Sequence, residues 1–548
     1  MGPALRATAR QGAVLLLFLA LALLATRPLA RDLRGQMPVG PDPLIDLWTL
    51  HWLTGHALEP AQLFHGNVFH PFSHAALHSD LSLGTAVLVL PLRPFVSDPV
   101  ALYNAGLLLA LAFGGWAFCR LVEALTGRLS AGLLSGVLAA FGSHQLYHVY
   151  HLNLLSVGWL ALLLLGLHRL AERPGPGPAL LAGVSFALSA LSSGYYAVAG
   201  VLLALAFAAA RARRLLAGRA LAWSAAAALL AAVLVWPYAR AFLALREESG
   251  LRRPVGMSVS MAFRPAHDLG SRAFAYSGLL GARGERLFPG LLALALAGAA
   301  LARRRPEAGF YAGATALLLL VSLGPRLELG ERSLALPYGL LFRLGPLDSM
   351  RHPYTFAAVG TFTLAVLAGL GWAGLRLSDR RGAGAAVVAL AVLETLGPPV
   401  RVRAVPPGLP AAYERLRQLP PGPLVELPPS LPEAMLWAAR HGRPVVNGIG
   451  AFAPPESLRL DHVVRRQWLR RPPPRVDGSA PDRLLRETFG ARYVVLDTRR
   501  PVRRRLAQAF GRSPGFRLVE AFPDGLCLYE LLPRGPAPPW TTAGAVVQ

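Results

Sequence analysis

Long apolar runs decide what this chain can fold into. They recur between residues 11 and 400, and many reach the ~18 residues that one helix needs to cross a bilayer. Hydrophobic residues make up 54% of the 548 positions, and the mean hydropathy is +0.43. These values exclude an ordinary soluble protein. We therefore predict a mainly α-helical, polytopic membrane domain.

About eleven runs qualify as membrane spans. The predicted spans are 11–30, 100–119, 129–147, 152–170, 178–194, 195–210, 219–240, 287–302, 307–324, 355–375 and 382–400. The first resembles a signal peptide, but we interpret it as an uncleaved helix because the topology requires it. Leu81–Val96 is also apolar, yet it is short and carries Pro91 and Pro94, so we predict a surface or re-entrant element.

The arginines orient these spans. The formal net charge is +25, and the chain contains no lysine. Cytoplasmic loops of membrane proteins are enriched in basic residues. With the N-terminus inside, every inside loop is basic, and these loops hold Arg120 and Arg128, Arg169 and Arg173, Arg211, Arg213, Arg214 and Arg219, Arg303, Arg304 and Arg305, and Arg376, Arg380 and Arg381. The sequence thus predicts a multi-pass membrane protein with a cytoplasmic N-terminus and an extracytoplasmic C-terminus.

The hydropathy falls near residue 400, where short β-like runs begin to alternate with helical patterns. The predicted strands are Leu424–Leu427, Pro444–Val446, Tyr493–Leu496, Phe516–Phe522 and Leu526–Leu531, and the predicted helices are Ala411–Leu419, Leu431–Arg440 and Pro481–Thr488. We predict a membrane domain over 1–400 with a first outer loop at 31–99, an extracytoplasmic α/β domain over 401–535, and a disordered tail over 536–548. Cys119 and Cys527 fall on opposite sides of the membrane in this topology, so no disulfide framework or cysteine metal site is expected.

The first outer loop carries acidic residues that are hard to explain by packing. Asp42 and Asp46 lie in MPVGPDPLIDLWTLHW (residues 37–52), where the pattern predicts an amphipathic helix on the membrane surface. A carboxylate there can act as a general base toward an acceptor hydroxyl or hold a divalent cation. The structural alternative is that Asp42 caps the helix, since Asp42-Pro43 fits a helix start. For Asp80 the same two interpretations stay open, a carboxylate of the active site and a helix cap.

Histidine, arginine and tyrosine residues join these acids on the predicted outer side. Two histidine groups have nearly helical spacing: His70, His74 and His78, and His144, His148 and His151. Pro71 disfavours a helix through the first group. The second group can bind phosphate, transfer protons or bind zinc, with buried, hydrogen-bonded histidines as the plainer alternative. Arg351 precedes a span and suits a phosphate group, although it can also extend to lipid headgroups.

Taken in order, these motifs resemble the GT-C class of membrane glycosyltransferases, which includes protein O-mannosyltransferases and aminoarabinose transferases. The resemblance covers nearly the whole chain. Bacterial multi-span members of the class carry a Gly-Asp-Pro-Leu-Leu-Asn-x-Trp-like first loop, and residues 41–48 read Pro-Asp-Pro-Leu-Ile-Asp-Leu-Trp here. Further matches are Ser79-Asp80-Leu81 to a Ser-Glu-His-Leu segment, His148 and His151 to a His-x-x-His helix end, Arg351, Pro353 and Phe356 to an Arg-x-Pro-x-x-Phe loop, and residues 443–455 to an outer-domain Arg-Pro-x-x-Asn-Gly stretch. Pro41 departs from the usual Gly, Asp80 from Glu and Leu81 from His.

The resemblance implies sugar transfer from a polyprenyl-phosphate carrier to a glycan, lipid or protein acceptor on the outer face of the membrane. It gives Asp42 the role of catalytic base or metal contact, and Asp46 and Asp80 are further catalytic candidates. Arg351, His148 and His151 are the candidates for binding the donor phosphate. His144, Tyr196 and His352 complete the set, although an aromatic belt also explains the tyrosine. The cofactor is unknown, and a divalent cation is one candidate.

Two other functions stay open. A lipid-linked glycan flippase or another transporter is disfavoured because the charged residues lie at span ends and the span centres are apolar. A non-catalytic membrane scaffold would bind partners through its outer domain. The sequence has no P-loop, HExxH or GxSxG motif, which removes support for ATP-driven and zinc-protease chemistry. It has no basic run interleaved with exposed aromatics, so nucleic acid is not an expected partner.

Overall fold

The structure, a computed structural model, describes residues 2–40, 42–215, 218–249, 287–329, 332–342, 350, 352–395, 397, 399–429, 432–469 and 484–532. The chain divides into two compact units. Unit 1 comprises Met1–Gly55, Asp80–Arg240 and Ser258–Val405, and unit 2 comprises His56–Ser79, Ala241–Met257 and Pro406–Gln548. The tail predicted at 536–548 lies outside the described residues.

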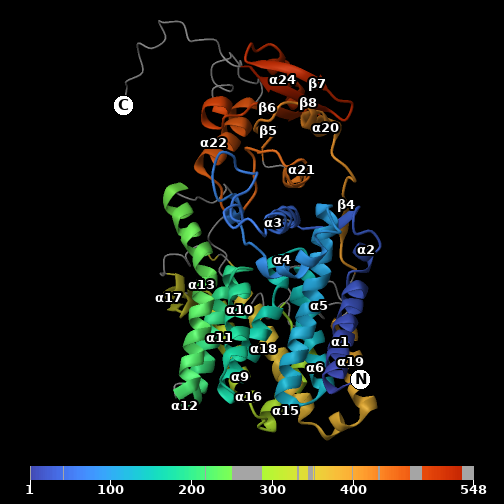
Figure 1. Cartoon of the computed structure of the whole chain (residues 1–548), viewed down its shortest axis with the longest axis vertical. Coiled ribbons are helices and arrows are strands. Elements are labelled where there is room, and N and C mark those ends of the chain that lie inside the picture. Colours follow the sequence, from blue (N-terminus) through green and yellow to red (C-terminus); the bar gives the residue numbers. More distant parts are fainter. Residues whose placement is uncertain are drawn as a thin grey trace. The chain divides into compact units, whose positions relative to one another are not determined.

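Unit 1 is a bundle of helices (Figure 1). Its helices are α1 (Pro3–Ala25), α2 (Arg27–Ala30), α3 (Pro43–Gly55), α4 (Leu83–Val89), α5 (Pro99–Thr126), α6 (Leu129–Ala140), α7 (Ser143–Tyr147), α8 (Leu152–Leu155), α9 (Gly158–Glu172), α10 (Pro176–Ala190), α11 (Gly194–Ala210), α12 (Ala212–Leu215), α13 (Gly218–Ser249, which runs into unit 2), α15 (Leu291–Ala302), α16 (Ala308–Ser322), α17 (Tyr338–Phe342), α18 (Tyr354–Ala373) and α19 (Arg381–Thr395), with the 3-10 turns η2 (Leu90–Leu92) and η5 (Arg376–Asp379). Two antiparallel strand pairs accompany them, β1 (Gln36–Pro38) with β4 (Val402–Ala404) and β2 (Arg326–Leu329) with β3 (Arg332–Ala335).

Apolar composition confirms the prediction of a mainly helical membrane protein. Among the described residues, five helical stretches are long and apolar enough to cross a bilayer, namely Thr8–Ala25, Pro99–Thr126, Leu152–Glu172, Gly218–Glu247 and Tyr354–Ala373. Six shorter apolar helical stretches accompany them. One of these, Leu83–Leu92, would rise only about 15 Å as a helix, which is too short to cross the hydrocarbon core.

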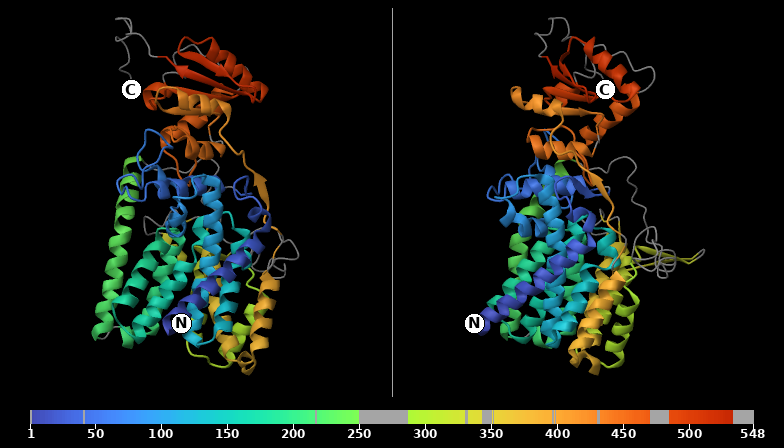
Figure 2. Two further views of the ribbon diagram at one scale, coloured as in Figure 1. Left: turned by 45° about the vertical axis from the view of Figure 1, so that its right-hand side comes forward. Right: turned by 90° about the vertical axis from the view of Figure 1, so that its right-hand side faces the viewer.

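Helix α5 is the central helix of unit 1. It packs against α1, α6 and α9, and the helices run side by side in both further views (Figure 2). Small residues allow such close approach between helices in membranes. A Cβ on Gly371, for example, would lie 1.8 Å from the carbonyl oxygen of Leu296, so α18 can contact α15 only because that position is glycine.

The predicted span 129–147 is not one helix. Helix α6 ends at Ala140, and α7 begins only at Ser143. His148 follows α7 and His151 precedes α8, so the histidines do not share a helical face as the spacing predicted. At the ends of α6 and α7 some backbone N–H and C=O groups have no partner within a helix. Where such groups are buried, they need hydrogen-bond partners elsewhere in the protein.

Helix α3 differs from the prediction of an amphipathic helix on the membrane surface. It packs against α4 and α5, and its side chains are buried along most of its length. Asp46, in its first turn, is only 4% exposed. The amphipathic pattern suggested a solvated carboxylate, but the structure gives Asp46 a hydrogen-bond partner inside the protein.

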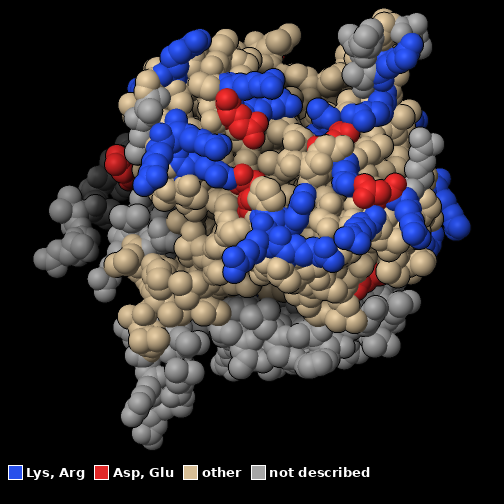
Figure 3. Space-filling model, turned by 90° about the horizontal axis from the view of Figure 1, so that it is seen from below, with Lys and Arg blue, Asp and Glu red and all other residues tan. Residues whose placement is uncertain are grey.

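The arginine-rich loops gather at one end of the bundle, as the view from below shows (Figure 3). Three pairs tie these loops together: Arg128 with Asp379 at 2.6 Å, Arg10 with Glu123 at 2.6 Å, and Arg211 with Glu307. The helices alternate in direction, so the loops at their opposite ends form a second, separate group. That second group contains the candidate site.

Unit 2 contains a four-stranded mixed sheet in the order β5-β6-β8-β7. Its strands are β5 (Leu424–Leu427), β6 (Tyr493–Asp497), β7 (Phe516–Ala521) and β8 (Leu526–Leu531), and its helices are α20 (Ala411–Gln418), α21 (Glu433–His441), α22 (Pro455–Val463) and α24 (Pro501–Gly511), with the π turns η6 (Val464–Trp468) and η7 (Leu484–Thr488). Strands β5 and β6 are parallel, whereas the other pairs are antiparallel. Phe489, Phe510 and Tyr529 belong to its apolar core. The predicted C-terminal mixture of strands and helices is confirmed.

Part of the first outer loop belongs to unit 2. Residues 67–70 run beside residues 445–447, with backbone hydrogen bonds from Val445 to Asn67 (2.7 Å) and from Phe69 to Asn447 (3.1 Å). The turn η1 (Ala75–His78) follows. The Asn447 side chain bonds both backbone groups of Glu426, at 2.6 Å and 2.9 Å. The outer-domain stretch that carried part of the family resemblance therefore holds unit 2 together.

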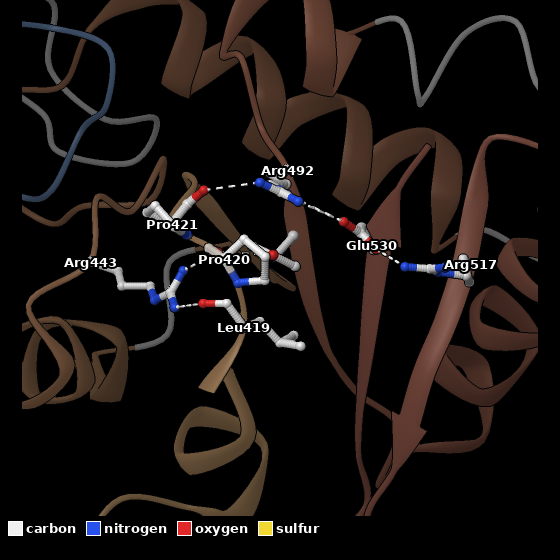
Figure 4. Close-up of polar contacts among 8 residues, drawn as sticks. Leu419, Pro420, Pro421, Arg443, Arg492, Arg517 and Glu530 are labelled. Carbon is white, nitrogen blue, oxygen red and sulfur yellow. Dashed lines mark hydrogen bonds and ion pairs between the residues drawn. The ribbon is translucent and has the colours of Figure 1, made fainter. Parts of the chain in front are cut away.

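Arg443, which opens that stretch, also has a structural role. Its guanidinium donates to the carbonyl oxygens of Leu419 and Pro420, just beyond the end of α20 (Figure 4). It also donates to the carbonyl oxygen of Leu416, in the last turn of that helix. A cation there satisfies carbonyls that a helix end leaves without partners. In the same figure Arg492 bridges the Pro421 carbonyl and Glu530.

Candidate active site

A short connection between α7 and α9 lies at the centre of the candidate site. It runs from His148 to Val157 and contains only the single turn α8. Buried side chains from other helices bond its backbone. Tyr103 donates to the carbonyl of Tyr150 (2.8 Å), Tyr196 and Gln145 donate to the carbonyl of Leu154 (2.5 and 3.1 Å), and Asp46 accepts from the N–H of Leu152 (2.8 Å). These bonds fix the connection in one conformation.

Asp42 is the accessible carboxylate of the group. Its side chain is 45% exposed, and its Oδ2 lies 3.5 Å from Nδ1 of His151. The Asp42 carbonyl accepts the N–H groups of Ile45 and Asp46, so the residue sits immediately before α3. A carboxylate that is open to solvent and next to an imidazole has the geometry of a general base.

Asp46 is buried instead of exposed. Its Oδ2 accepts the Leu152 N–H, so this carboxylate links α3 to the connection. Burial raises the pKa of Asp46; the Leu152 hydrogen bond lowers it, and the nearby Asp42 and Asp80 carboxylates raise it further. These three acids therefore lie close enough to influence one another.

Asp80 links the outer loop to two other segments. Its Oδ2 accepts from Nδ2 of Asn153 at 2.6 Å, and its Oδ1 accepts from the backbone N–H of Gly194 at 3.4 Å. Gly194 is the first residue of α11, so the carboxylate lies at a helix N-terminus, where negative charge is stabilised. Burial raises the pKa of Asp80, and the hydrogen bonds from Asn153 and Gly194, together with the nearby Ser193, lower it.

The three histidines of the second group remain neighbours despite the broken helix. The ring centroids of His144 and His148 are 4.5 Å apart, and those of His148 and His151 are 5.6 Å apart. Burial lowers the pKa of His151 to about 3, and His148 and His352 add to the effect. His151 is therefore neutral at physiological pH and faces Asp42 as an uncharged imidazole.

Of the remaining candidate residues, the structure describes His352 and Tyr196. His352 donates its backbone N–H to the hydroxyl of Tyr195 at 2.8 Å, and it lies within electrostatic range of His151. Tyr196 is fully buried with its hydroxyl on Leu154, which does not fit a lipid-facing aromatic belt. Arg351 lies outside the described residues. Over the ranges described above, no group of three or more His, Cys, Asp or Glu side chains is arranged to hold a metal ion.

Sequence reasoning missed Asn153 and Tyr103. Both are polar residues at the starts of apolar runs, in His151-Leu152-Asn153-Leu154 and Leu102-Tyr103-Asn104-Ala105. A polar side chain at the end of a span usually has a partner, because unpaired polar groups are costly there. That position was the available signal, but the partner itself could not be read from the sequence.

The chain resembles solved structures more than it resembles known sequences. No protein-family model and no curated protein match it. The mycobacterial arabinofuranosyltransferase AftD superposes with a TM-score of 0.61 at 16% identity, over 96% of this chain and 40% of AftD. The chain has the fold of the GT-C membrane glycosyltransferases. It spans less than half the length of AftD.

Two further solved structures of the GT-C fold match over nearly the whole chain. They are the oligosaccharyltransferase AglB from Archaeoglobus fulgidus, with a TM-score of 0.42, 13% identity and coverage of 95% of this chain and 74% of AglB, and ArnT from Cupriavidus metallidurans, with a TM-score of 0.40, 14% identity and coverage of 96% and 98%. Scores this low carry no argument about function. The GT-C assignment is a statement about fold, and the chemistry must be argued from the residues.

Proposed function

We propose that this protein is a membrane glycosyltransferase that moves a sugar from a polyprenyl-phosphate carrier to a cell-envelope acceptor. The observation that carries the proposal is the accessible Asp42 carboxylate, 3.5 Å from His151 at the end of a GT-C-like bundle. The apolar bundle suits a lipid carrier, and a carboxylate beside imidazoles suits proton removal next to a phosphate.

In this proposal Asp42 accepts the proton of an acceptor hydroxyl. The acceptor oxygen then attacks the anomeric carbon, and the bond from that carbon to the phosphate oxygen breaks, with the electron pair staying on the phosphate. Neutral His151 can donate an N–H hydrogen bond to a phosphate oxygen, and His148 lies beside it. The phosphate charge would raise the pKa of His151 from about 3, because an adjacent anion favours the imidazolium. Arg351 is the proposed cationic partner of the same phosphate.

The geometry favours positioning roles for Asp46 and Asp80 over direct catalysis. Asp46 is buried against the Leu152 N–H, and Asp80 is bonded to Asn153 and Gly194. Both carboxylates therefore hold the connection that carries His151. This leaves Asp42 as the proposed base.

The orientation and span count are part of the proposal. The arginine-rich end would face the cytoplasm, and the end with Asp42 would face the opposite side. About eleven spans would cross the membrane, and the α/β unit would be extracytoplasmic. Cysteine labelling near Asp42 and in the Arg303–Arg305 loop tests this arrangement. Labelling of both sites from one side would contradict it.

A transfer assay tests the chemistry. The purified protein is given labelled polyprenyl-phosphate sugars and cell-envelope acceptors, with and without a chelator. We expect wild-type protein to release polyprenyl phosphate with matching label in the acceptor, and Asp42→Asn protein to lose this turnover. Movement of intact donor across a vesicle membrane without transfer would support a flippase, and equal turnover by both proteins would remove Asp42 from the mechanism.

A further inference from the structure

A second polar group lies beside the phosphate candidates, and the mechanism above gives it no chemical task. It consists of Asp80, Asn153 and Ser193, which come from three separate segments of unit 1. Asn153 donates to Asp80 at 2.6 Å, and Ser193 lies close enough to lower the pKa of the same carboxylate. Three segments thus bring a carboxylate, a carboxamide and a hydroxyl to one place.

The group has hydrogen-bonding capacity left over. Oδ1 of Asn153 is buried and has no hydrogen-bond partner among the described residues, and the same holds for the fully buried hydroxyl of Ser82. The segment that contains Ser82 runs beside residues 191–194, with Leu83 bonded to the Leu191 carbonyl (3.3 Å) and Gly84 bonded to the Ser192 hydroxyl (2.7 Å). Buried polar atoms without partners are costly, so they indicate a place where a polar ligand completes the bonding.

Its place along the chain is next to the proposed phosphate site. Asn153 follows His151 by two residues, so their Cα atoms are within about 8 Å of each other. A donor whose phosphate lies against His151 would therefore present its sugar ring near Asn153. Carboxylate, carboxamide and hydroxyl groups are suited to the hydroxyls of a sugar, because they supply both acceptors and donors.

The charge of the group restricts which sugar fits. None of the hydrogen bonds to Asp80 within the described ranges comes from an arginine or a histidine. A second carboxylate brought into this buried setting would meet repulsion from Asp80 that none of these hydrogen-bond partners relieves. A neutral hydroxyl or an amine meets no such penalty.

We propose that Asp80, Asn153 and Ser193 form the donor-sugar subsite, and that it takes a neutral or amine-bearing sugar and rejects a sugar acid. The inference rests on the proposed function, because it places the sugar relative to the phosphate held by His151. It also adds substrate recognition to the positioning role of Asp80.

Binding measurements test the subsite without relying on turnover. The full-length protein in detergent is titrated with farnesyl phosphate and with farnesyl-phosphate derivatives of arabinose, mannose, aminoarabinose and galacturonate. We expect at least one neutral or amino sugar to bind on the order of 10-fold more tightly than farnesyl phosphate alone. The galacturonate derivative should bind no more tightly than farnesyl phosphate.

Four variants, one of them a control, locate the effect. Within each variant, Asn153→Ala and Asp80→Asn should lose the gain in affinity of the sugar derivatives over farnesyl phosphate, and Asp80→Asn should also admit galacturonate. Asn153→Ser provides a milder change if either variant is not monodisperse. Ser156→Ala is the matched control. Ser156 lies in the same connection as Asn153, and the substitution removes its 2.9 Å hydrogen bond to Thr85 while leaving Asp80, Asn153 and Ser193 unchanged.

Each outcome decides a different point. No gain from any sugar in wild type, or an unchanged gain in Asn153→Ala and Asp80→Asn, overturns the subsite. A gain that Ser156→Ala also abolishes overturns it too, because the effect would then be structural. Sugar-dependent binding with no transfer by wild type overturns the proposed function and leaves the subsite standing.

Discussion

Two groups of histidines have nearly the same spacing in the sequence and very different surroundings in the structure. His144, His148 and His151 stack beside one another in unit 1, and the last of them faces Asp42. The residues of the other group, His70, His74 and His78, lie in the part of the outer loop that belongs to unit 2. Spacing alone therefore predicted a shared helical face that the first group does not have, and it did not predict the different surroundings of the two groups.

The loop histidines pack individually. His74 has a left-handed backbone with φ of 59°, bonds the Ser73 hydroxyl at 3.0 Å and stacks near His65. His78 is 1% exposed, and its ring lies 4.6 Å from that of Phe69. A Cβ on Gly450 would lie 2.7 Å from the backbone oxygen of His78, so residue 450 packs closely against this turn. Burial lowers the pKa of His78 to about 4. What separates the two groups is the accessible carboxylate beside the first.

The largest effect is expected where that carboxylate is removed. Asp42→Asn should lower turnover on the order of 10²- to 10⁴-fold, the range for losing a general base. Asp98→Asn is the matched control. Asp98 caps α5 through a 2.9 Å bond to Ala101, and asparagine caps equally well. Steady-state transfer rates measure both variants. If the two variants behaved alike, Asp42 would be no more than another helix-start residue.

The next effect separates the two histidine groups directly. His151→Gln should raise the KM for the donor on the order of 10- to 100-fold, because it removes a hydrogen bond to a charged phosphate. His74→Gln should leave the KM within about twofold of wild type, because it changes only a loop contact. Donor titrations at saturating acceptor give both values. A similar rise in both variants would mean that the phosphate is bound through unit 2 as well.

The sequence predicted elements well where a local pattern determines them. Strands Leu424–Leu427 and Leu526–Leu531 have the predicted bounds, because alternation and flanking prolines mark them. Apolar runs such as 355–375 correspond closely to helices, here α18 (Tyr354–Ala373). The break at Phe141–Gly142 was missed, because residues 129–147 form one continuous apolar pattern, and the partners of the connection that follows, such as Asp46 and Tyr196, lie far away in the sequence.

The candidate site was predictable only as a list of residue types. Topology placed Asp42, Asp80 and His151 on one side of the membrane, and the structure gathers them at one end of the bundle. Asp46 was expected on a solvated face, yet α3 packs against α4 and α5, and the buried carboxylate accepts the N–H of Leu152, which lies 106 residues away. Asn153 was missed for the same reason, since its partner Asp80 lies 73 residues away.

Lowering the pH should destabilise the folded protein through one histidine of each group. His151 and His78 have pKa values of about 3 and about 4 when folded, against 6.5 when unfolded. Below pH 6.5 the unfolded chain therefore binds more protons than the folded protein does, so the free energy of unfolding falls as the pH drops. Above pH 6.5 these two histidines no longer reduce the free energy of unfolding. For His151 the loss should be about 2 kcal/mol between pH 6.5 and 5. Thermal unfolding of His151→Gln across this range should show a shallower decline than wild type. An unchanged slope would mean that His151 is already protonated in the folded protein.

The smallest effect is expected at His74, where the backbone matters more than the ring. At φ of 59° asparagine is well tolerated, so His74→Asn should change the free energy of unfolding by less than about 0.5 kcal/mol and leave turnover unchanged. His74→Val places a β-branched side chain in the same conformation and should lose about 1–2 kcal/mol. Because the two variants remove the same imidazole, a difference in stability with equal turnover would assign this position to loop geometry. A loss of turnover in His74→Asn would show instead that the loop group takes part in the chemistry, and the contrast with His151 would fail.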